Sequence, residues 1–273
     1  MSAFPLVIYL VRAGVGSRRR CDELVRAKSV TVDGEVVTFP RQLVPDGAVV
    51  QVEGQTAVLR ELRYVLVNKP RGVASTRSDP HADKVLVDMV PDGRTLFPVG
   101  RLDVDTTGLI VLTNDGPLAN YLMHPRYGVA KTYTARVRGR VSKRALSALR
   151  AGVVLEDGLA SAAEARLIKQ SNKTALVEVL LREGRKRQVR RMFEALGLPV
   201  EELHRRRYGP LSDKRLAVGE HRALTAEEVD ALRRAGEVVQ DAVLGEPEEQ
   251  PVRLSADAVA ELRDRSQQGD TPV

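Results

Sequence analysis

The first part of the chain changes from a helical to an alternating pattern of apolar residues. The pattern predicts two helices and then strands, at residues 6–14, 17–28, 30–37 and 48–54. Ser17 is a favourable N-cap for the second helix, and Asp33-Gly34 is the dipeptide typical of a tight hairpin turn. We therefore expect a small α+β domain over residues 1–54.

A longer series of strand and helix patterns begins near Leu62, after a short linker. The expected strands lie at residues 64–68, 109–113, 132–138, 163–168 and 175–181. The expected helices begin at Pro117, Ser142, Gln188 and Thr225, the last with a capping box completed by Glu228. Because strands and helices do not alternate in strict βαβ order, we expect an α+β domain over 61–235, with a mixed, mostly antiparallel sheet and flanking helices.

Charge is distributed unevenly along the chain. Residues 61–235 carry 32 Lys/Arg against 21 Asp/Glu, whereas residues 236–273 carry 3 against 9 and contain EPEEQP. The last segment is therefore expected to be an acidic, flexible tail. The basic excess of the middle segment favours a partner that carries phosphates, although basic proteins also bind anionic membranes.

Composition argues against several other classes of protein. No apolar run reaches the roughly 18 to 20 residues of a membrane span, and no signal peptide opens the chain, so we expect a cytoplasmic protein. Aromatic residues make up only 4%, which argues against docking on a membrane surface. Cys21 is the single cysteine and is expected to be buried; the four histidines are scattered, so no metal site is expected.

Two carboxylates stand in a loop bracketed by glycines before an expected strand. The segment PVGRLDVDTTGLIVLTNDG, residues 98–116, contains Asp103 and Asp105 beside Arg101. Loops at the end of a sheet often present functional side chains. We interpret Asp105 as a turn residue whose side chain bonds to nearby backbone amides.

The motif GRLDVDTTGL resembles the central motif of pseudouridine synthases, in the branch that modifies ribosomal RNA. Three further segments resemble motifs of this family in the same order: YVLVNKPRG at 64–72, KTYTARV at 131–137 and LREGRKRQVRRMFEALG at 181–197. Four ordered matches are far more specific than one short motif. Residues 9–37 resemble the S-four-like RNA-binding domain that often precedes this catalytic domain.

The resemblance implies an isomerase whose catalytic carboxylate is Asp103. The reaction breaks the bond from ribose to the uracil ring nitrogen and joins ribose to ring carbon five, so no cofactor is expected. By the same resemblance Tyr133 stacks on the target uracil, and Arg190 pairs with Asp103 to keep it ionised. Arg187 is the alternative for that position. The sequence leaves open whether Asp103 attacks the sugar or the ring.

The target base must be unpaired or flipped out of its stack, and contacts with RNA must supply the free energy. The residues expected to contact RNA are all basic: Arg18, Arg19, Arg26, Lys28, Lys69, Arg101, Arg185, Lys186, Arg187, Arg191, Arg205, Arg206 and Arg207. The alternative for each is a solvated basic surface.

The sequence thus predicts a monomeric pseudouridine synthase whose partner is ribosomal RNA. The segment EGRKRQVRRMFEALGLPV, with RRYGPL after it, is most similar to the enzymes of the large subunit. Two alternatives remain open: an enzyme of small-subunit ribosomal RNA, and a catalytically silent RNA-binding factor in ribosome assembly.

Overall fold

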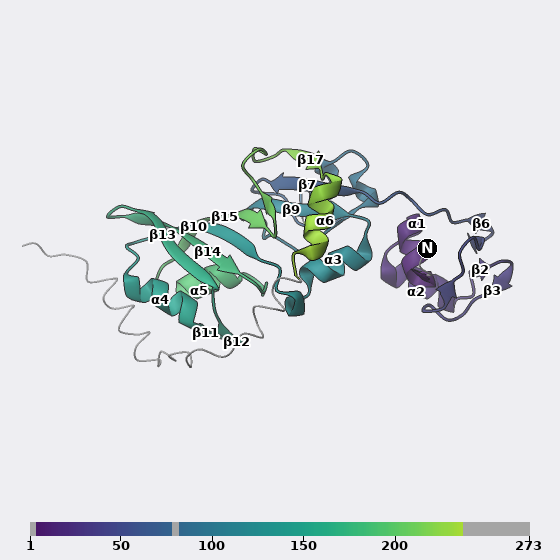
Figure 1. Cartoon of the computed structure of the whole chain (residues 1–273), viewed down its shortest axis with the longest axis horizontal. Coiled ribbons are helices and arrows are strands. Elements are labelled where there is room, and N and C mark those ends of the chain that lie inside the picture. Colours follow the sequence, from purple (N-terminus) through teal and green to yellow (C-terminus); the bar gives the residue numbers. More distant parts are fainter. Residues whose placement is uncertain (1–3, 78–81, 237–273) are drawn as a thin grey trace, which may run out of the picture.

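The computed structural model describes residues 4–77 and 82–236, which form a small first unit and a larger second unit (Figure 1). The tail expected at 236–273 lies almost wholly outside these residues. The elements of the first unit are β1 (Phe4–Pro5), α1 (Leu6–Ala13), α2 (Arg18–Arg26), β2 (Val30–Val32), β3 (Glu35–Val36), β4 (Leu43–Val44), β5 (Val50–Val52) and β6 (Gln55–Thr56).

The first unit packs its two helices on a four-stranded antiparallel sheet of order β3-β2-β5-β6. Ser17 caps α2 through the backbone amide of Arg20, as predicted. The predicted hairpin joins β2 to β3, and Asp33 and Gly34 have φ of 51° and 85°, as a type I′ turn requires. Cys21 is buried in this core, which also confirms the prediction.

The second unit contains one large sheet with helices on both faces. Its elements are β7 (Tyr64–Lys69), η1 (Leu86–Met89), η2 (Gly93–Thr95), β8 (Phe97–Pro98), β9 (Thr107–Thr113), α3 (Gly116–Met123), η3 (Pro125–Tyr127), β10 (Lys131–Arg138), α4 (Lys143–Ala151), β11 (Val153–Leu155), β12 (Gly158–Ala160), β13 (Glu164–Gln170), β14 (Thr174–Leu181), α5 (Gln188–Ala195), β15 (Val200–Tyr208), β16 (Leu211–Ser212), β17 (His221–Ala223) and α6 (Ala226–Arg234).

The large sheet has the order β13-β14-β10-β15-β9-β7-β17. Its neighbouring strands are antiparallel except β9 and β15, which run parallel to each other. The predicted α+β class, with a mixed, mostly antiparallel sheet, is therefore confirmed. The expected capping box of the last helix is also present, between Thr225 and Glu228.

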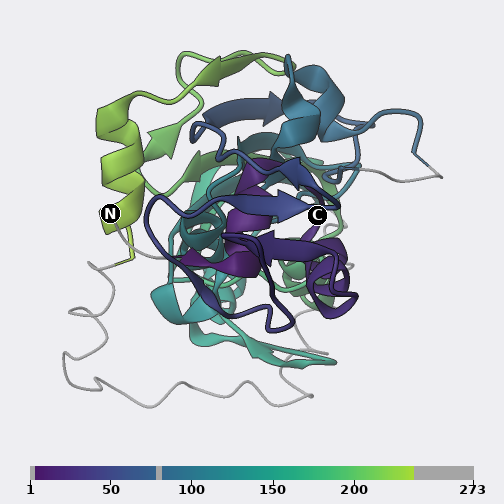
Figure 2. The same cartoon turned by 90° about the vertical axis from the view of Figure 1, so that its right-hand side faces the viewer.

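Side chains alternate between two cores on opposite faces of the central strands. Val65, Val67, Ile110 and Leu112 face a core that is completed by α4 and α5. Leu66, Leu109 and Val111 face a core that is completed by α3 and α6, two helices that contact each other. In Figure 2 the first unit lies in front of this layered second unit.

Strand β15 was not predicted, because most residues of VEELHRRRY are charged. It lies between β10 and β9, so its Arg205 enters the middle of the sheet. Gly108 of β9 faces Arg205 with φ of 117°, and a Cβ at Gly108 would lie 2.4 Å from the Arg205 backbone nitrogen. The close approach of these two strands therefore requires glycine at position 108.

Candidate active site

A cavity of about 770 Å³ opens where the loop before β9 meets β10 and the segment before α5. Asp103 comes from this loop and Tyr133 from β10, and both line the cavity. A turn that places the Thr106 amide 3.0 Å from the Asp103 carbonyl leads the loop into β9. The structure thus brings together the carboxylate and the tyrosine that the sequence singled out.

Lys69 holds this loop from inside the protein by a hydrogen bond to one of its backbone carbonyls. Its side chain is fully buried, and Nζ donates to the carbonyls of Val73 at 2.8 Å, Pro70 at 3.0 Å and Val104 at 3.4 Å. Burial lowers the pKa of Lys69 to about 8, against the opposing influence of Asp105 and Asp103. The prediction that Lys69 contacts RNA is wrong, because its donors are used inside the protein.

The predicted ion pair between Arg190 and Asp103 is also wrong. Arg190 Nη2 lies 3.0 Å from Asp105 Oδ2, and Nη1 donates to the carbonyl of Val200 at 2.9 Å. The cation that faces Asp103 is Arg187, whose Nη1 lies 3.9 Å from Asp103 Oδ2 and 3.6 Å from Asp105 Oδ1. Arg187 was the alternative for this position.

The conformation of the segment before α5 explains why Arg187, and not Arg190, faces Asp103. Arg187 is the N-cap of α5 with φ of 51°, a left-handed conformation that non-glycine residues adopt rarely. Arg190 lies one turn further on and is buried, and this burial lowers its pKa. Asp105 is therefore more than a turn residue, because its carboxylate is the partner of a buried cation.

Arg205 lies at the inner end of the cavity. It is only 2% exposed; Nε donates to the carbonyl of Leu109 at 2.6 Å, and Nη1 lies 3.5 Å from Tyr133 Oη. Arg205 therefore does not belong to an exposed basic cluster as the sequence suggested, and its contact with RNA stays a prediction. Lys131 also lines the cavity, and burial, together with Arg205, lowers its pKa to about 8.

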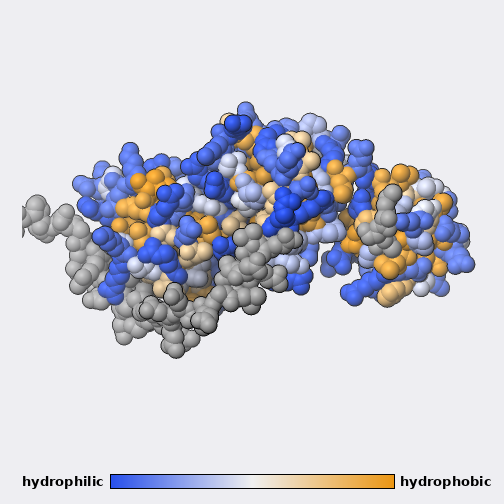
Figure 3. Space-filling model, viewed as in Figure 1, coloured by the Kyte–Doolittle hydropathy of each residue, from blue (hydrophilic) through white to orange (hydrophobic). Residues whose placement is uncertain are grey.

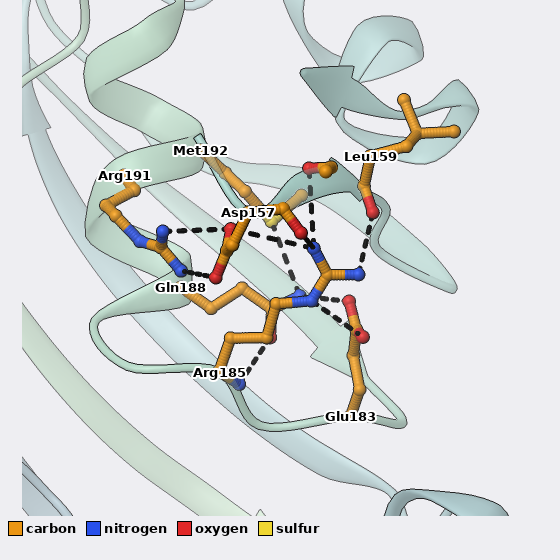
Figure 4. Close-up of polar contacts among 8 residues, drawn as sticks. Asp157, Leu159, Glu183, Arg185, Gln188, Arg191 and Met192 are labelled. Carbon is orange, nitrogen blue, oxygen red and sulfur yellow. Dashed lines mark hydrogen bonds and ion pairs between the residues drawn. The ribbon is translucent and has the colours of Figure 1, made fainter. Parts of the chain in front are cut away.

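Arg185 and Arg191 bind the β11–β12 hairpin (Figure 4). Both carboxylate oxygens of Asp157 accept from Arg191, at 3.0 and 2.9 Å. The guanidinium of Arg185 donates to the carbonyls of Asp157, Gly158 and Leu159, the last at 2.7 Å. Both arginines were predicted to contact RNA, but here their donors connect α5 and the segment before it to the hairpin.

The other basic residues of the prediction are exposed to solvent: Arg18, Arg19, Arg26, Lys28, Arg101, Lys186, Arg187, Arg206 and Arg207. Arg26 binds Asp22 at 2.6 Å, and Arg206 binds Asp213 at 3.2 Å. Figure 3 shows hydrophilic residues over much of the visible face of the second unit. Contact of these residues with RNA stays a prediction.

Sequence reasoning missed the roles of Asp105, Asp157 and Lys131. Asp105 carried a signal, since it stands two residues after Asp103 in the same loop. Asp157 carried none, because only the folded chain brings it to α5.

Across residues 4–77 and 82–236 the structure contains no group of three or more side chains suited to hold a metal ion. No helix in the same ranges is long and apolar enough to span a membrane.

Comparison with known proteins gives the family to which this fold and this site belong. The family described as RNA pseudouridylate synthase matches residues 63–195, and the S4 domain matches residues 4–50. The chain belongs to the RNA pseudouridine synthase family, as its motifs predicted, and is an enzyme of that class.

Individual relatives cover most of the chain. It is 42% identical to "Ribosomal large subunit pseudouridine synthase B" of Bacillus subtilis (strain 168), over 82% of this chain and 93% of the relative. A protein of the same name from Vibrio cholerae is 36% identical over 94% of this chain and 81% of its own length. A solved structure, "Crystal structure of pseudouridylate synthase", superimposes with a TM-score of 0.59 at 29% identity, over 83% of this chain and 98% of that one.

Proposed function

We propose that this enzyme converts one specific uridine of large-subunit ribosomal RNA to pseudouridine. The observation that carries the proposal is a single cavity that holds Asp103 and Tyr133 and is bordered by Arg101, Lys186 and Arg187. The substrate class comes from the relatives, several of which are named as ribosomal large subunit pseudouridine synthases. We further propose that the enzyme works as a monomer in the cytoplasm, since one chain supplies every proposed catalytic side chain.

In this proposal Asp103 is the catalytic carboxylate. Its side chain is 30% exposed, so the group is accessible from the cavity while it remains held by the loop. A carboxylate can act as a covalent nucleophile toward the sugar or the ring, or as a base. Arg187, 3.9 Å from Asp103 Oδ2, holds a positive charge beside it and can also approach a phosphate of the bound RNA.

Tyr133 is the proposed stacking partner of the target uracil. Its side chain lies on the central strand β10, which is held on one side by β14 and on the other by β15. A side chain on a central strand is fixed more firmly than one on a loop, and a flipped base needs such a fixed surface to stack against.

Arg190 acts in this proposal by holding the catalytic loop. Its bonds to Asp105 and to the Val200 carbonyl connect the loop to α5 and to β15. Lys69 holds the same loop through the carbonyl of Val104. Two buried cations therefore bind the loop that carries Asp103, a rigid arrangement suited to catalysis.

The RNA itself is bound, in this proposal, by the exposed basic residues of both units. The first unit contributes Arg18, Arg19, Arg26 and Lys28 around α2. The second contributes Arg101, Lys186 and Arg187, which line the cavity, and the exposed Arg206 and Arg207 of β15. These charges would neutralise phosphates and so supply the free energy that is spent when the target base leaves its stack.

Mapping of pseudouridine in ribosomal RNA from cells with and without the protein tests the proposal. We expect the loss of one position in the large-subunit RNA, and its return when the wild-type chain is restored. Loss of a position in small-subunit RNA would contradict the proposed subunit and retain the enzyme. An unchanged map in both RNAs would contradict ribosomal RNA as the substrate.

A further inference from the structure

Two cations at the inner end of the cavity have no acidic partner in the described part of the chain. Arg205 Nη2 is buried and has no hydrogen-bond partner among the described residues. Lys131 is 8% exposed, and its Nζ donates only to the carbonyl of Val129, at 3.0 Å. Both residues line the cavity that holds Asp103 and Tyr133.

Such an arrangement is costly in the free protein. Buried charges in proteins are usually paired, and buried donors usually have acceptors, because the charge has lost its water. The Arg205 guanidinium lies 4.8 Å from the ring centre of Tyr208 and 6.0 Å from that of Tyr133. These aromatic rings attract the cation, but they do not supply an in-plane acceptor for Nη2. The missing acceptor therefore points to a ligand that enters the cavity.

The reaction creates an acceptor of the required charge. When the bond between ring N1 and ribose C1′ breaks, its electron pair stays on the ring, and the detached uracil is an anion with charge on its carbonyl oxygens. The turned ring then forms the C5–C1′ bond with a ring electron pair. The proton released from C5 balances the proton that N1 takes up, so no other reactant is needed.

We propose that Arg205 is a further catalytic residue, whose Nη2 donates to a carbonyl oxygen of the flipped uracil and stabilises the anion of the detached ring. The inference rests on the proposed function, because it requires uracil in this cavity. Tyr133 would hold the face of the ring while Arg205 binds its edge. Lys131, whose pKa burial lowers to about 8, adds positive charge behind Arg205.

The geometry of β15 keeps Arg205 in place for this task. Nε is fixed by the carbonyl of Leu109 at 2.6 Å, and the backbone pairs with Gly108 of β9. Gly108 is the second residue of β9, directly after the loop that carries Asp103. The contact between Gly108 and Arg205 therefore positions this loop as well. A fixed donor that needs no rearrangement during the reaction stabilises a developing charge most effectively.

The test compares single-turnover rates and RNA affinity of wild type, Arg205→Gln and Arg205→Lys on ribosomal RNA. For Arg205→Gln we expect a rate about 100-fold lower at saturating RNA with unchanged affinity, the loss typical of one missing donor to a developing anion. Arg205→Lys keeps the charge and should recover part of the rate. Arg166→Gln is the matched control, since Arg166 is exposed on the edge strand β13 and bound to Glu178.

Two outcomes would overturn the inference while leaving the proposed function intact. One is a folded Arg205→Gln variant with the wild-type rate. The other is weaker RNA binding with an unchanged rate at saturation, which would assign Arg205 to a backbone phosphate. If wild type itself forms no pseudouridine in ribosomal RNA, the proposed function fails and the inference fails with it.

A measurement on the wild-type enzyme covers the case in which the Arg205 variants do not fold. RNA that carries 2-thiouridine or 4-thiouridine at the mapped target replaces one carbonyl oxygen by sulfur, a weaker acceptor. We expect one of the two RNAs to react more slowly at saturation, with unchanged affinity. Equal rates for both thio-RNAs and for unmodified RNA would overturn the inference.

Discussion

Two segments of this chain are rich in arginine and lysine, yet the fold uses them differently. The first surrounds α2, where Arg18, Arg19 and Lys28 are exposed and take part in no ion pair among the described residues. The second, residues 182–191, has six basic residues in ten. Of these, Arg190 is bound to Asp105, Arg191 to Asp157 and Arg185 to the hairpin.

The difference shows that density of positive charge does not measure the charge that is available to a phosphate. The partners of the second segment come from distant parts of the sequence, with Asp157 34 residues from Arg191 and Asp105 85 residues from Arg190. These pairs connect α5 to the loop that carries Asp103 and to the β11–β12 hairpin. Around α2, Arg18, Arg19 and Lys28 stay in solvent without an ion partner among the described residues, and there they can release counterions from RNA.

The largest effect is expected when a cation that builds the site is removed. Arg190→Ala removes the nearer of the two arginines that face Asp105 and the donor to the Val200 carbonyl, and breaking a buried pair costs about 3 kcal/mol of stability. Because the loop also loses its position, activity should fall about 100-fold or more. Thermal unfolding and pseudouridine formation check both effects. Wild-type activity in this variant would show that the loop holds Asp103 without Arg190.

A large effect on RNA binding is expected when the first unit, which carries the first segment, is deleted. Deleting residues 1–60 removes the whole first unit, including β6 and the buried Ala57, and leaves the two cores of the second unit intact. We expect weaker RNA binding, with a salt slope shallower by about 2, since three or more phosphate contacts are lost. Titration of affinity against salt concentration measures this slope. An unchanged slope would mean that the first unit does not touch the phosphates.

The buried Lys69 predicts a dependence of stability on pH. Its pKa is about 8 in the folded chain against an ordinary 10.5, so between these values the unfolded chain holds a proton that the folded chain lacks. Unfolding then takes up a proton, and rising pH disfavours it. Wild type should gain stability relative to Lys69→Met as the pH rises from about 8 to 10, measured by denaturant unfolding. A constant difference would contradict the burial of the charge.

The smallest effects are expected from single substitutions, one in each of the two arginine-rich segments. Arg19→Gln should make the salt slope of RNA binding shallower by about 1, because a free phosphate contact is lost. Arg191→Gln removes the same charge but should leave the slope unchanged, and should lower stability only slightly, since Asp157 is 46% exposed. The reverse pattern would mean that Arg191 leaves Asp157 to bind RNA.

The sequence predicted most of this fold because its signals are local. The hairpin at Asp33-Gly34, the capping box at Thr225 and the apolar strands each depend on neighbouring residues, and all are present. Strand β15 was missed because its charged residues conceal the alternation that places Leu203 and Arg205 on one face. Its burial is decided by β9 and β10, which lie far away in the sequence.

The fold brings two of the predicted site residues together but pairs the arginines differently from the prediction. Motif resemblance identified Asp103 and Tyr133, which do share a cavity. It could not tell whether Arg187 or Arg190 faces Asp103, because that depends on the left-handed backbone at Arg187. Nor could a count of charges show that Lys69 and Arg205 are buried.

The central claim is that Asp103 carries the reaction while the basic surfaces carry the binding. Asp103→Asn keeps the size of the side chain but removes the charge and the nucleophilic oxygen, so pseudouridine formation should disappear while RNA affinity survives. Asp230→Asn, a change to an exposed carboxylate on α6, is the control and should keep both properties. Formation of pseudouridine by Asp103→Asn at the wild-type rate, measured with affinity on the same preparation, would contradict the account.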